Sequence, residues 1–278
     1  MLEEEVKLEA PIGLALPDLR HLVGGTARLP EEKLVTRYFD TTDRRIWGQD
    51  MTLRHRQTED GAEGTWTLKL PHGSTGRALQ RTEVTWSGPG DAIPAEAMDL
   101  LRGVIRREPL RHLTTLKTTR GRLVLRDDLG HELAELDDDL VVVVGGSRDG
   151  TQFRQVELEL RDRMWNGDQV LSLLEEAGAR VENRQKLAKA IDLPEPPSPG
   201  YSVDQGSTLA DVLRASLRSG LDRLVAHDWR LRLALPEPTP HDIHQARVAT
   251  RRLRSDLKSF GSVLDPVWHR HVRSELKW

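Results

Sequence analysis

Charged and apolar side chains alternate with a period of two in five separate segments of this chain, and no other sequence feature constrains the fold as strongly. In a β-strand, residues i and i+2 lie on the same face. Glu3, Glu5 and Lys7 therefore share one face of an N-terminal strand, while Val6 and Leu8 lie on the other. The same alternation recurs at Arg54 and Arg56, at Lys69, at Arg81 and Glu83, and at Glu157, Glu159 and Arg161.

This ionic face has two interpretations. An ordinary antiparallel sheet with one face in solvent also shows polar alternation, and for a single strand that interpretation is the simpler one. Here, however, Arg and Glu stand in blocks of opposite sign on different strands. Such blocks favour a closed antiparallel β-barrel with an ionic lumen, because buried charges are tolerated only when they are paired or bound to a metal and an anion.

Turn-rich patches, helical periodicity and prolines divide the chain. Two stretches over 94–106 and 167–177 have helical apolar spacing, and we expect them to plug or flank the sheet. The Pro-rich run over 194–200 indicates a domain boundary. Beyond it the pattern predicts a helix from 207 or 208 to about 233, a proline break at 236–240, and a second helix starting near His241. The predicted fold is therefore α+β: a closed antiparallel barrel with flanking helices over 1–193, a linker over 194–206 and an all-α segment over 207–278.

Composition excludes several classes of protein. A net charge of −3 over 278 residues provides no global basic field, so we expect neither sequence-specific nucleic-acid binding nor membrane binding. The chain contains no cysteine, which excludes disulfides and thiolate metal sites. It has no apolar run of eighteen residues, and acidic residues stand where a signal peptide needs positive charge. We expect a soluble cytoplasmic protein.

The residues of the alternating strands also carry a family resemblance. In order and spacing, the segment from Leu2 to Leu193 resembles the CYTH, or triphosphate tunnel, family. The similar motifs are Glu3-x-Glu5-x-Lys7, Tyr38-Phe39-Asp40-Thr41, Leu53-Arg54-His55-Arg56, Thr67-Leu68-Lys69, Arg81-Thr82-Glu83, Val156-Glu157-Leu158-Glu159 and Gln185-Lys186.

The resemblance implies a tunnel that binds a triphosphate, either tripolyphosphate or a nucleoside triphosphate, together with Mg²⁺ or Mn²⁺. Acidic side chains cannot face a triphosphate without an intervening cation, and both metals prefer oxygen ligands. The substrate-binding residues implied are Lys7, Arg54, Arg56, Lys69, Arg81, Lys117, Arg120 and Lys186. The metal ligands implied are Glu3, Glu5, Glu83, Asp137, Glu157 and Glu159.

Individual positions within this resemblance stay open. Lys7 and Tyr38 are the candidates for positioning or deprotonating an attacking water, although Tyr38 also suits simple packing at a barrel end. The family often places a basic residue two positions after Lys117, where this chain has Thr119. Either Arg120 or Arg122 is a candidate to replace it. The acidic residue expected near 135–137 has several candidates, since three successive aspartates follow Leu136.

The C-terminal segment contains a cationic helix pattern. Its basic stripe comprises His244, Arg247, Arg251, Arg254 and Lys258, and a separate apolar stripe comprises Ala246, Ala249, Leu253, Leu257 and Phe260. The run from His244 to Arg254 resembles the opening of a CHAD domain, a module associated with inorganic polyphosphate. A solvated basic face is the alternative interpretation. A zinc site at the nearby histidine pairs is disfavoured, because no third ligand has a fixed place.

The resulting hypothesis is a Mg²⁺- or Mn²⁺-dependent triphosphatase that acts on inorganic tripolyphosphate and carries a polyphosphate-binding segment. An adenylate cyclase built on the same tunnel is a second hypothesis, although the sequence shows no evident base-binding pocket. A binding protein that holds polyphosphate without turnover is the third. No Walker loop, dinucleotide fingerprint or nucleophile elbow indicates another chemistry.

Overall fold

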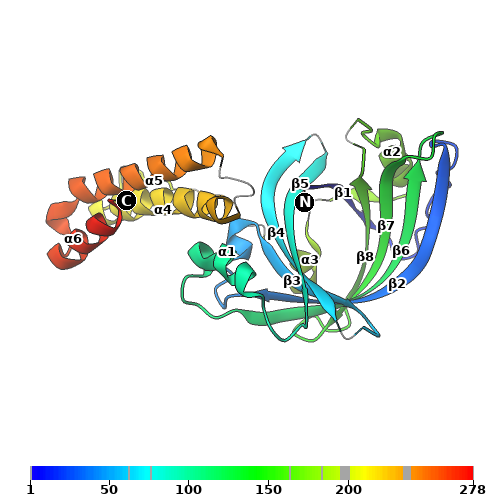
Figure 1. Cartoon of the computed structure of the whole chain (residues 1–278), viewed down its shortest axis with the longest axis horizontal. Helices are drawn as coiled ribbons and strands as arrows, with labels where there is room; N and C mark the ends of the chain where they lie inside the picture. Colours follow the sequence, from blue (N-terminus) through cyan, green and yellow to red (C-terminus); the bar gives the residue numbers. More distant parts are fainter. Residues whose placement is uncertain are drawn as a thin grey trace. The chain divides into compact units, whose positions relative to one another are not determined.

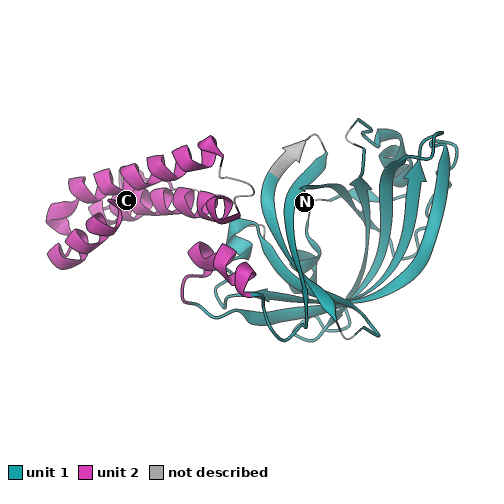
Figure 2. Ribbon diagram, in the orientation of Figure 1, with its two compact units in different colours: residues 1–94, 108–196 teal, residues 95–107, 197–278 magenta. Residues whose placement is uncertain are grey.

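The computed structural model divides the chain into two compact units. It describes residues 2–61, 63–75, 77–162, 164–182, 184–194, 201–233 and 239–277. Unit 1 comprises 1–94 and 108–196, and unit 2 comprises 95–107 and 197–278 (Figure 2). Much of the predicted linker, residues 195–200, lies outside the described residues, as do 234–238 in the proline break, so the linker stays a prediction.

Unit 1 is built from antiparallel strands. They are β1 (Leu2–Ala10), β2 (Gly25–Asp40), β3 (Thr52–Thr58), β4 (Gly64–Thr75), β5 (Ala78–Gly88), β6 (Arg111–Arg126), β7 (Glu132–Val144), β8 (Gln152–Leu160) and the short β9 (Arg180–Val181). A 3₁₀ turn, η1 (Trp47–Gln49), precedes β3. Two short helices, α2 (Asp168–Glu176) and α3 (Lys186–Ile191), follow β8.

The first strand closes the sheet into a barrel. The strands neighbour one another in the order β5-β4-β3-β2-β6-β7-β8-β1, and β1 also pairs with β5 (Figure 1). Residues 2–5 of β1 pair with β5, and residues 5–10 pair with β8. The predicted α+β fold with a closed antiparallel barrel is therefore confirmed.

The strand register collects charges on the inner face. Glu5 lies opposite Glu159, and Lys7 lies opposite Glu157. Lys69 of β4 lies opposite Glu83 of β5, and Arg120 of β6 lies opposite Asp139 of β7. Directly opposed residues share a face of the sheet. The alternation seen in the sequence therefore produces an ionic barrel interior.

An outer apolar core packs α2 against the barrel wall. Val6 and Leu8, which alternate with the inward charges of β1, pack with Leu158 of β8 and with Val170 and Leu174 of α2. Gly167 begins this helix with φ 68°, a left-handed conformation that glycine adopts without strain. A Cβ there would lie 2.8 Å from Leu158 Cδ2. The expected helix over 167–177 thus flanks the sheet.

An inner apolar core places α3 inside the barrel at one end. Leu187, Ala188 and Ala190 of α3 pack with a set of strand and loop residues. That set comprises Tyr38, Trp47, Leu116, Val141 and Val143. Leu116 lies on the same face of β6 as Arg120, and Val141 shares the face of Asp139, because β6 and β7 pair without a bulge between Thr115 and Leu125. Helix α3 is therefore the element that plugs the sheet.

Unit 2 is helical and includes a helix that interrupts the strand sequence. Its helices are α1 (Ala95–Ile105), α4 (Leu209–Leu233), α5 (Pro240–Ser259) and α6 (Pro266–Glu275), with a 3₁₀ turn η2 (Gly261–Val263). Gly220 lets α4 approach α5, since a Cβ there would lie 2.6 Å from Leu253 Cδ2. Thr239 caps α5 by accepting a hydrogen bond from the Asp242 amide. Both helices predicted in this segment are present.

The helix over 94–106 was expected to plug or flank the sheet; it packs instead on α4 and belongs to unit 2. Among the described helices, none has the length and apolar character needed to cross a membrane. The cytoplasmic location stays a prediction.

We expect Leu158→Ala to lower the free energy of unfolding by about 2–5 kcal/mol, because the variant loses buried methyl groups and leaves a cavity. Leu158 is fully buried in the outer core. Denaturant titration followed by tryptophan fluorescence measures the change. Leu129→Ala is the control, since Leu129 is 81% exposed, and its change should stay within about 0.5 kcal/mol. Equal losses in the two variants would contradict the outer core.

Candidate functional site

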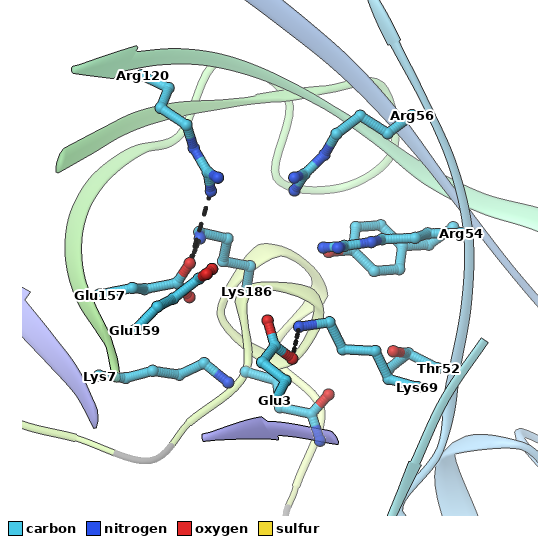
Figure 3. Close-up of a pocket in the computed structure, with 12 residues that line it drawn as sticks. Glu3, Lys7, Thr52, Arg54, Arg56, Lys69, Arg120, Glu157, Glu159 and Lys186 are labelled. Atoms are coloured by element: carbon cyan, nitrogen blue, oxygen red, sulfur yellow. Dashed lines mark hydrogen bonds and ion pairs between the residues drawn. The ribbon is translucent and has the colours of Figure 1, made fainter. Parts of the chain in front are cut away.

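The barrel interior holds a cavity with predominantly charged walls (Figure 3). The lining comprises Glu3, Lys7, Tyr38, Thr52, Arg54, Arg56, Lys69, Arg120, Glu157, Glu159, Gln185 and Lys186. The side chains come from strands on all sides of the barrel and from the start of α3. A barrel of this kind presents charges of both signs to one bound molecule.

A carboxylate cluster lies on the β1–β8 side of this cavity. One oxygen from each of Glu3, Glu5 and Glu159 lies within 4.8 Å of the others. Glu5 is 1% exposed, and its Oε2 has no hydrogen-bond partner among the described residues. A buried carboxylate oxygen without a donor needs a cation, and hard divalent cations take oxygen ligands at this spacing. The cluster therefore fits Mg²⁺ or Mn²⁺.

The pKa values of the cluster reflect burial and crowding. Burial raises the pKa of Glu3 to about 7, against the opposing charge of Lys69. Burial likewise raises the pKa of Glu159 above its ordinary value. Burial also disfavours the charged form of Glu5, but Lys69 and Lys7 outweigh it and hold the pKa of Glu5 below its ordinary value. A bound cation would relieve the repulsion among the three groups.

The other three predicted metal ligands hold cations of the protein instead of joining the cluster. Glu83 lies 2.8 Å from Lys69 Nζ, and its pKa is about 2 because Lys69 and Arg54 outweigh the effect of burial. Glu157 lies 2.7 Å from Lys186 Nζ, and Asp137 forms an ion pair with Arg120. All six predicted ligands form ion pairs with cations of the protein, including Glu3 with Lys69 at 2.6 Å, and only Glu3, Glu5 and Glu159 of the six also come together in the carboxylate cluster.

A cationic wall lines the cavity: in Figure 3, Arg54 and Arg56 lie across the cavity from Glu159, and Arg120 and Lys186 lie next to Glu157. Arg54 and Arg56 project from β3, Arg120 projects from β6, and Lys186 begins α3. Burial and the neighbouring Arg54 and Arg120 lower the pKa of Arg56 to about 10. No carboxylate in the described part of the chain forms an ion pair with Arg56. This crowding of cations favours a bound anion.

Buried carboxylates hold the rest of the wall in place. Arg120 donates from Nε and Nη2 to the two carboxylate oxygens of Asp139, at 2.7 Å each. Lys186 Nζ lies 2.7 Å from Asp139 and 2.7 Å from Glu157. A group held by two buried partners loses little further freedom when it meets a ligand.

The structure corrects the predicted role of Lys117. Its side chain is 54% exposed and pairs with Glu59 at 2.8 Å, away from the cavity. Because β6 alternates without a bulge here, Lys117 and Thr119 lie on the outer face, and Thr118, Arg120 and Arg122 lie on the inner face. Arg120 is therefore the basic residue that lines the cavity. Arg122 instead pairs with Glu135 and Glu32.

Arg81 also departs from its predicted place. It is 7% exposed and lies opposite Glu3 on the barrel wall, but it is absent from the cavity lining and contacts Asp50. Conversely, Thr52 and Gln185 line the cavity without having been predicted. Thr52 could have been found from its spacing, because it stands two residues before Arg54 on the same strand face. Gln185 lies in a connection with no periodic pattern.

Lys7 and Tyr38 both reach the cavity. Lys7 Nζ lies 2.6 Å from Glu5 Oε1, next to the carboxylate cluster. Tyr38 lines the cavity and also packs in the inner core. Tyr38, Glu83 and Glu3 raise the pKa of Arg54 despite its burial. The two interpretations of Tyr38, site residue and packing residue, are therefore both compatible with its position.

The basic stripe of α5 is a solvent-facing surface. His244, Arg247, Arg251 and Lys258 are exposed, and Arg254 is half-buried. The buried face of the same helix comprises Ala249, Leu253 and Leu257, with Asp242 at its start. Asp256 accepts a hydrogen bond from Ser216 of α4 at 2.7 Å. The stripe is thus an exposed cationic face on one helix.

Models of two known families match the two parts of the chain. A CYTH domain model matches residues 1–190, and a CHAD domain model matches residues 215–278. Two uncharacterized proteins from two strains of Mycobacterium tuberculosis are each 30% identical over 253 residues, which is 84% of this chain. The matches cover 47% of each relative, so the chain spans about half the length of the curated relatives it matches.

Two solved structures of proteins named as "putative" cyclases are also similar. An adenylate cyclase of this kind from Bacillus halodurans is 24% identical, with a TM-score of 0.43, over 57% of this chain and 82% of that one. An adenylyl cyclase from Hippeastrum, described with a dominant triphosphatase activity, is 18% identical, with a TM-score of 0.45, over 67% and 93%. Similarities at this level do not bear on function.

We expect Lys186→Met to lower the free energy of unfolding by about 3–5 kcal/mol, because it leaves Asp139 and Glu157 buried beside one fewer cation. Lys117→Met removes an exposed ion pair and should cost less than about 1 kcal/mol. Denaturant titrations of the two variants measure both values. Similar losses would contradict the placement of the two lysines on opposite faces of the barrel wall.

Proposed function

Because the chain belongs to the CYTH domain family, we propose that its barrel is a divalent-metal-dependent hydrolase of a triphosphate, with inorganic tripolyphosphate as substrate and pyrophosphate and phosphate as products. One observation carries the proposal: a carboxylate cluster suited to a metal and a cationic wall suited to a polyanion share one cavity. Glu5 Oε2 in the cluster and Arg56 in the wall, which lack an ionic partner among the described residues, would each gain from a ligand of the opposite charge.

The cationic wall supplies the substrate contacts in this proposal. Arg54, Arg56 and Arg120 would donate to the phosphoryl oxygens, with Lys69 and Lys186 as further point charges. Arginine is suited to bidentate phosphate contacts, and lysine supplies a movable charge. These cations approach from β3, β4, β6 and α3, so they can hold a flexible polyanion from several sides.

The carboxylate cluster supplies the metal site. Glu3, Glu5 and Glu159 would bind Mg²⁺ or Mn²⁺, whose oxygen preference they match. A bound divalent ion of this kind neutralises charge on phosphoryl oxygens and acidifies a nearby water. Lys7, held against Glu5 at 2.6 Å, lies where it can orient that water. Tyr38 is the second candidate for this role, from the opposite side of the cavity.

The lining favours a substrate without a base. Tyr38 is the single aromatic residue among the lining residues, and its ring packs in the inner core. A nucleotide enzyme needs a surface that stacks on the base or bonds to it. The cavity offers charged side chains that match phosphate groups. This composition supports tripolyphosphate over ATP, and hydrolysis over cyclisation.

We propose that the helical segment binds long-chain inorganic polyphosphate. The exposed residues of the α5 stripe repel one another, and a polyanion lying along the helix would relieve that repulsion. The stripe carries no acidic side chain, because Asp256 turns toward Ser216 of α4. The CHAD match over 215–278 includes the whole stripe.

We expect Glu5→Gln to reduce metal-dependent phosphate release from tripolyphosphate at least about 100-fold. The substitution removes a direct metal ligand in this proposal, and loss of even the groups that merely orient such ligands costs about 10–100-fold. Phosphate release is measured from tripolyphosphate, ATP and long-chain polyphosphate, with and without Mg²⁺ or Mn²⁺.

The matched control for this experiment is Glu59→Gln, which changes an exposed carboxylate outside the barrel and should leave the rate unchanged. Full metal-dependent release by Glu5→Gln would refute the metal site. Cyclic AMP formed from ATP would refute the hydrolase and establish a cyclase. Binding of polyphosphate without turnover under either metal would establish a binding protein.

We expect the double variant Arg247→Gln/Arg251→Gln to weaken binding of long-chain polyphosphate about 30-fold at low salt, because each exposed charge contact is worth about 1 kcal/mol in water. Arg214→Gln/Arg218→Gln removes the same charge from exposed positions of α4 and is the control. Filter binding at several salt concentrations measures both. Equal weakening in the two double variants would indicate a general charge effect without a site on α5.

A further inference from the structure

Asp50 holds Arg81 at the plugged end of the barrel. Its Nη1 donates to the Asp50 main-chain carbonyl at 2.6 Å and lies 2.8 Å from Asp50 Oδ2, while Nη2 donates to Oδ1 at 2.9 Å. Asp50 directly follows η1 and adopts a left-handed conformation with φ 55°. The guanidinium therefore fixes both the main chain and the side chain of Asp50 against β5.

The same carboxylate also holds the start of α3. Gln185 Nε2 donates to Asp50 Oδ1 at 3.1 Å. Gln185 is the residue before the helix, and Lys186 is its first residue. The Lys186 ammonium then reaches Asp139 and Glu157 at 2.7 Å each. A continuous set of contacts thus connects β5, the loop before β3, and a cation of the cavity wall.

The loop that carries Asp50 is itself fixed, and it also holds the far end of α3. Asp40 is buried and accepts hydrogen bonds from the amides of Ile46 at 2.9 Å and Trp47 at 3.0 Å. The Trp47 indole Nε1 donates to the Pro194 carbonyl at 2.9 Å, just beyond α3. One loop therefore contacts the chain at both ends of the plug helix.

We propose that Asp50 is a positioning residue of the site, which places Lys186 against the cavity through Gln185 and α3. Helix α3 has six residues, and helices this short do not hold their conformation or direction without tertiary contacts. The inner core fixes the depth of α3, and the Asp50 contact fixes its first turn, from which Lys186 projects. The consequence for substrate rests on the proposed function; the placement of Lys186 does not.

Variants that differ in what happens to Arg81 separate this role from simple stabilisation. The Asp50 side chain is 42% exposed, but deleting it leaves the buried Arg81 without its acidic partner. Asp50→Gly deletes the carboxylate and keeps the left-handed backbone without strain. Asp50→Asn retains an oxygen that accepts from Gln185 and tolerates the same backbone conformation. Gln185→Ala breaks the contact to α3 and leaves the Arg81–Asp50 pair intact.

The placement of Lys186 is read directly from its side-chain ammonium signal in NMR spectra of protein with ¹⁵N-labelled lysine, assigned with Lys186→Met. We expect a protected, well-dispersed signal in the unchanged protein and in Asp50→Asn, and loss of that protection in Asp50→Gly and Gln185→Ala. Glu59→Ala is the control outside the barrel and should match the unchanged protein. An unchanged signal in Gln185→Ala, or in folded Asp50→Gly, would overturn the proposal.

Calorimetric titration with tripolyphosphate in the absence of divalent metal tests the consequence for the ligand. We expect Asp50→Gly to bind about ten-fold more weakly, the loss typical of one displaced contact to a charged group, and Asp50→Asn to recover most of the affinity. Absence of binding in every variant, with the ammonium signal changed as expected, shows that tripolyphosphate does not bind the metal-free cavity and keeps the positioning role. Equal affinities in all variants, with an unchanged signal, overturn the positioning role alone.

Discussion

The cost of removing charges from water determines how the interior of this barrel is built. Glu157 and Asp139 are buried, and each lies beside Lys186 and Arg120. An isolated ion in such a place costs several kcal/mol, so each charge depends on its neighbours being present. The wall of the cavity is therefore one network. Its cations are held in position before any ligand arrives, which is the condition for precise recognition of a polyanion.

Two groups in the network lack a further contact among the described residues: the Oε2 atom of Glu5, although Lys7 pairs with Oε1, and the guanidinium of Arg56, which has no carboxylate partner. Glu5 Oε2 is buried without a donor among the described residues, and burial beside Arg54 and Arg120 lowers the pKa of Arg56. A cation alone would satisfy the first and increase the excess of positive charge near the second. A polyanion alone would do the reverse. Under the proposed function, a divalent metal and a triphosphate bound together would satisfy both.

The sequence predicted those parts of the site that depend on local periodicity. In β1 and β8 the charges alternate with apolar residues, so the inward face was evident and Glu3, Glu5 and Glu159 were identified. In β6 both faces carry basic residues, and only the pairing with Asp139 shows that Arg120 points inward while Lys117 points outward. The plugging role of α3, the packing of α1 on α4 and the capture of Arg81 by Asp50 are tertiary contacts between segments far apart in the chain, and no repeating pattern encodes them.

The two cationic surfaces of the chain differ in the physics of anion binding. In the cavity, the arginines and lysines are buried or half-buried, and carboxylates hold Arg120 and Lys186, so an anion meets an ordered site that salt screens weakly. On α5 the stripe faces solvent, where charges separated by more than about 8 Å are largely screened at physiological ionic strength. The first arrangement suits a short anion of defined length, because each oxygen must meet a particular donor. The second suits a long polymer with repeated charges. Its weak contacts along one helix are interchangeable, so the polymer can exchange one contact for another and stay bound.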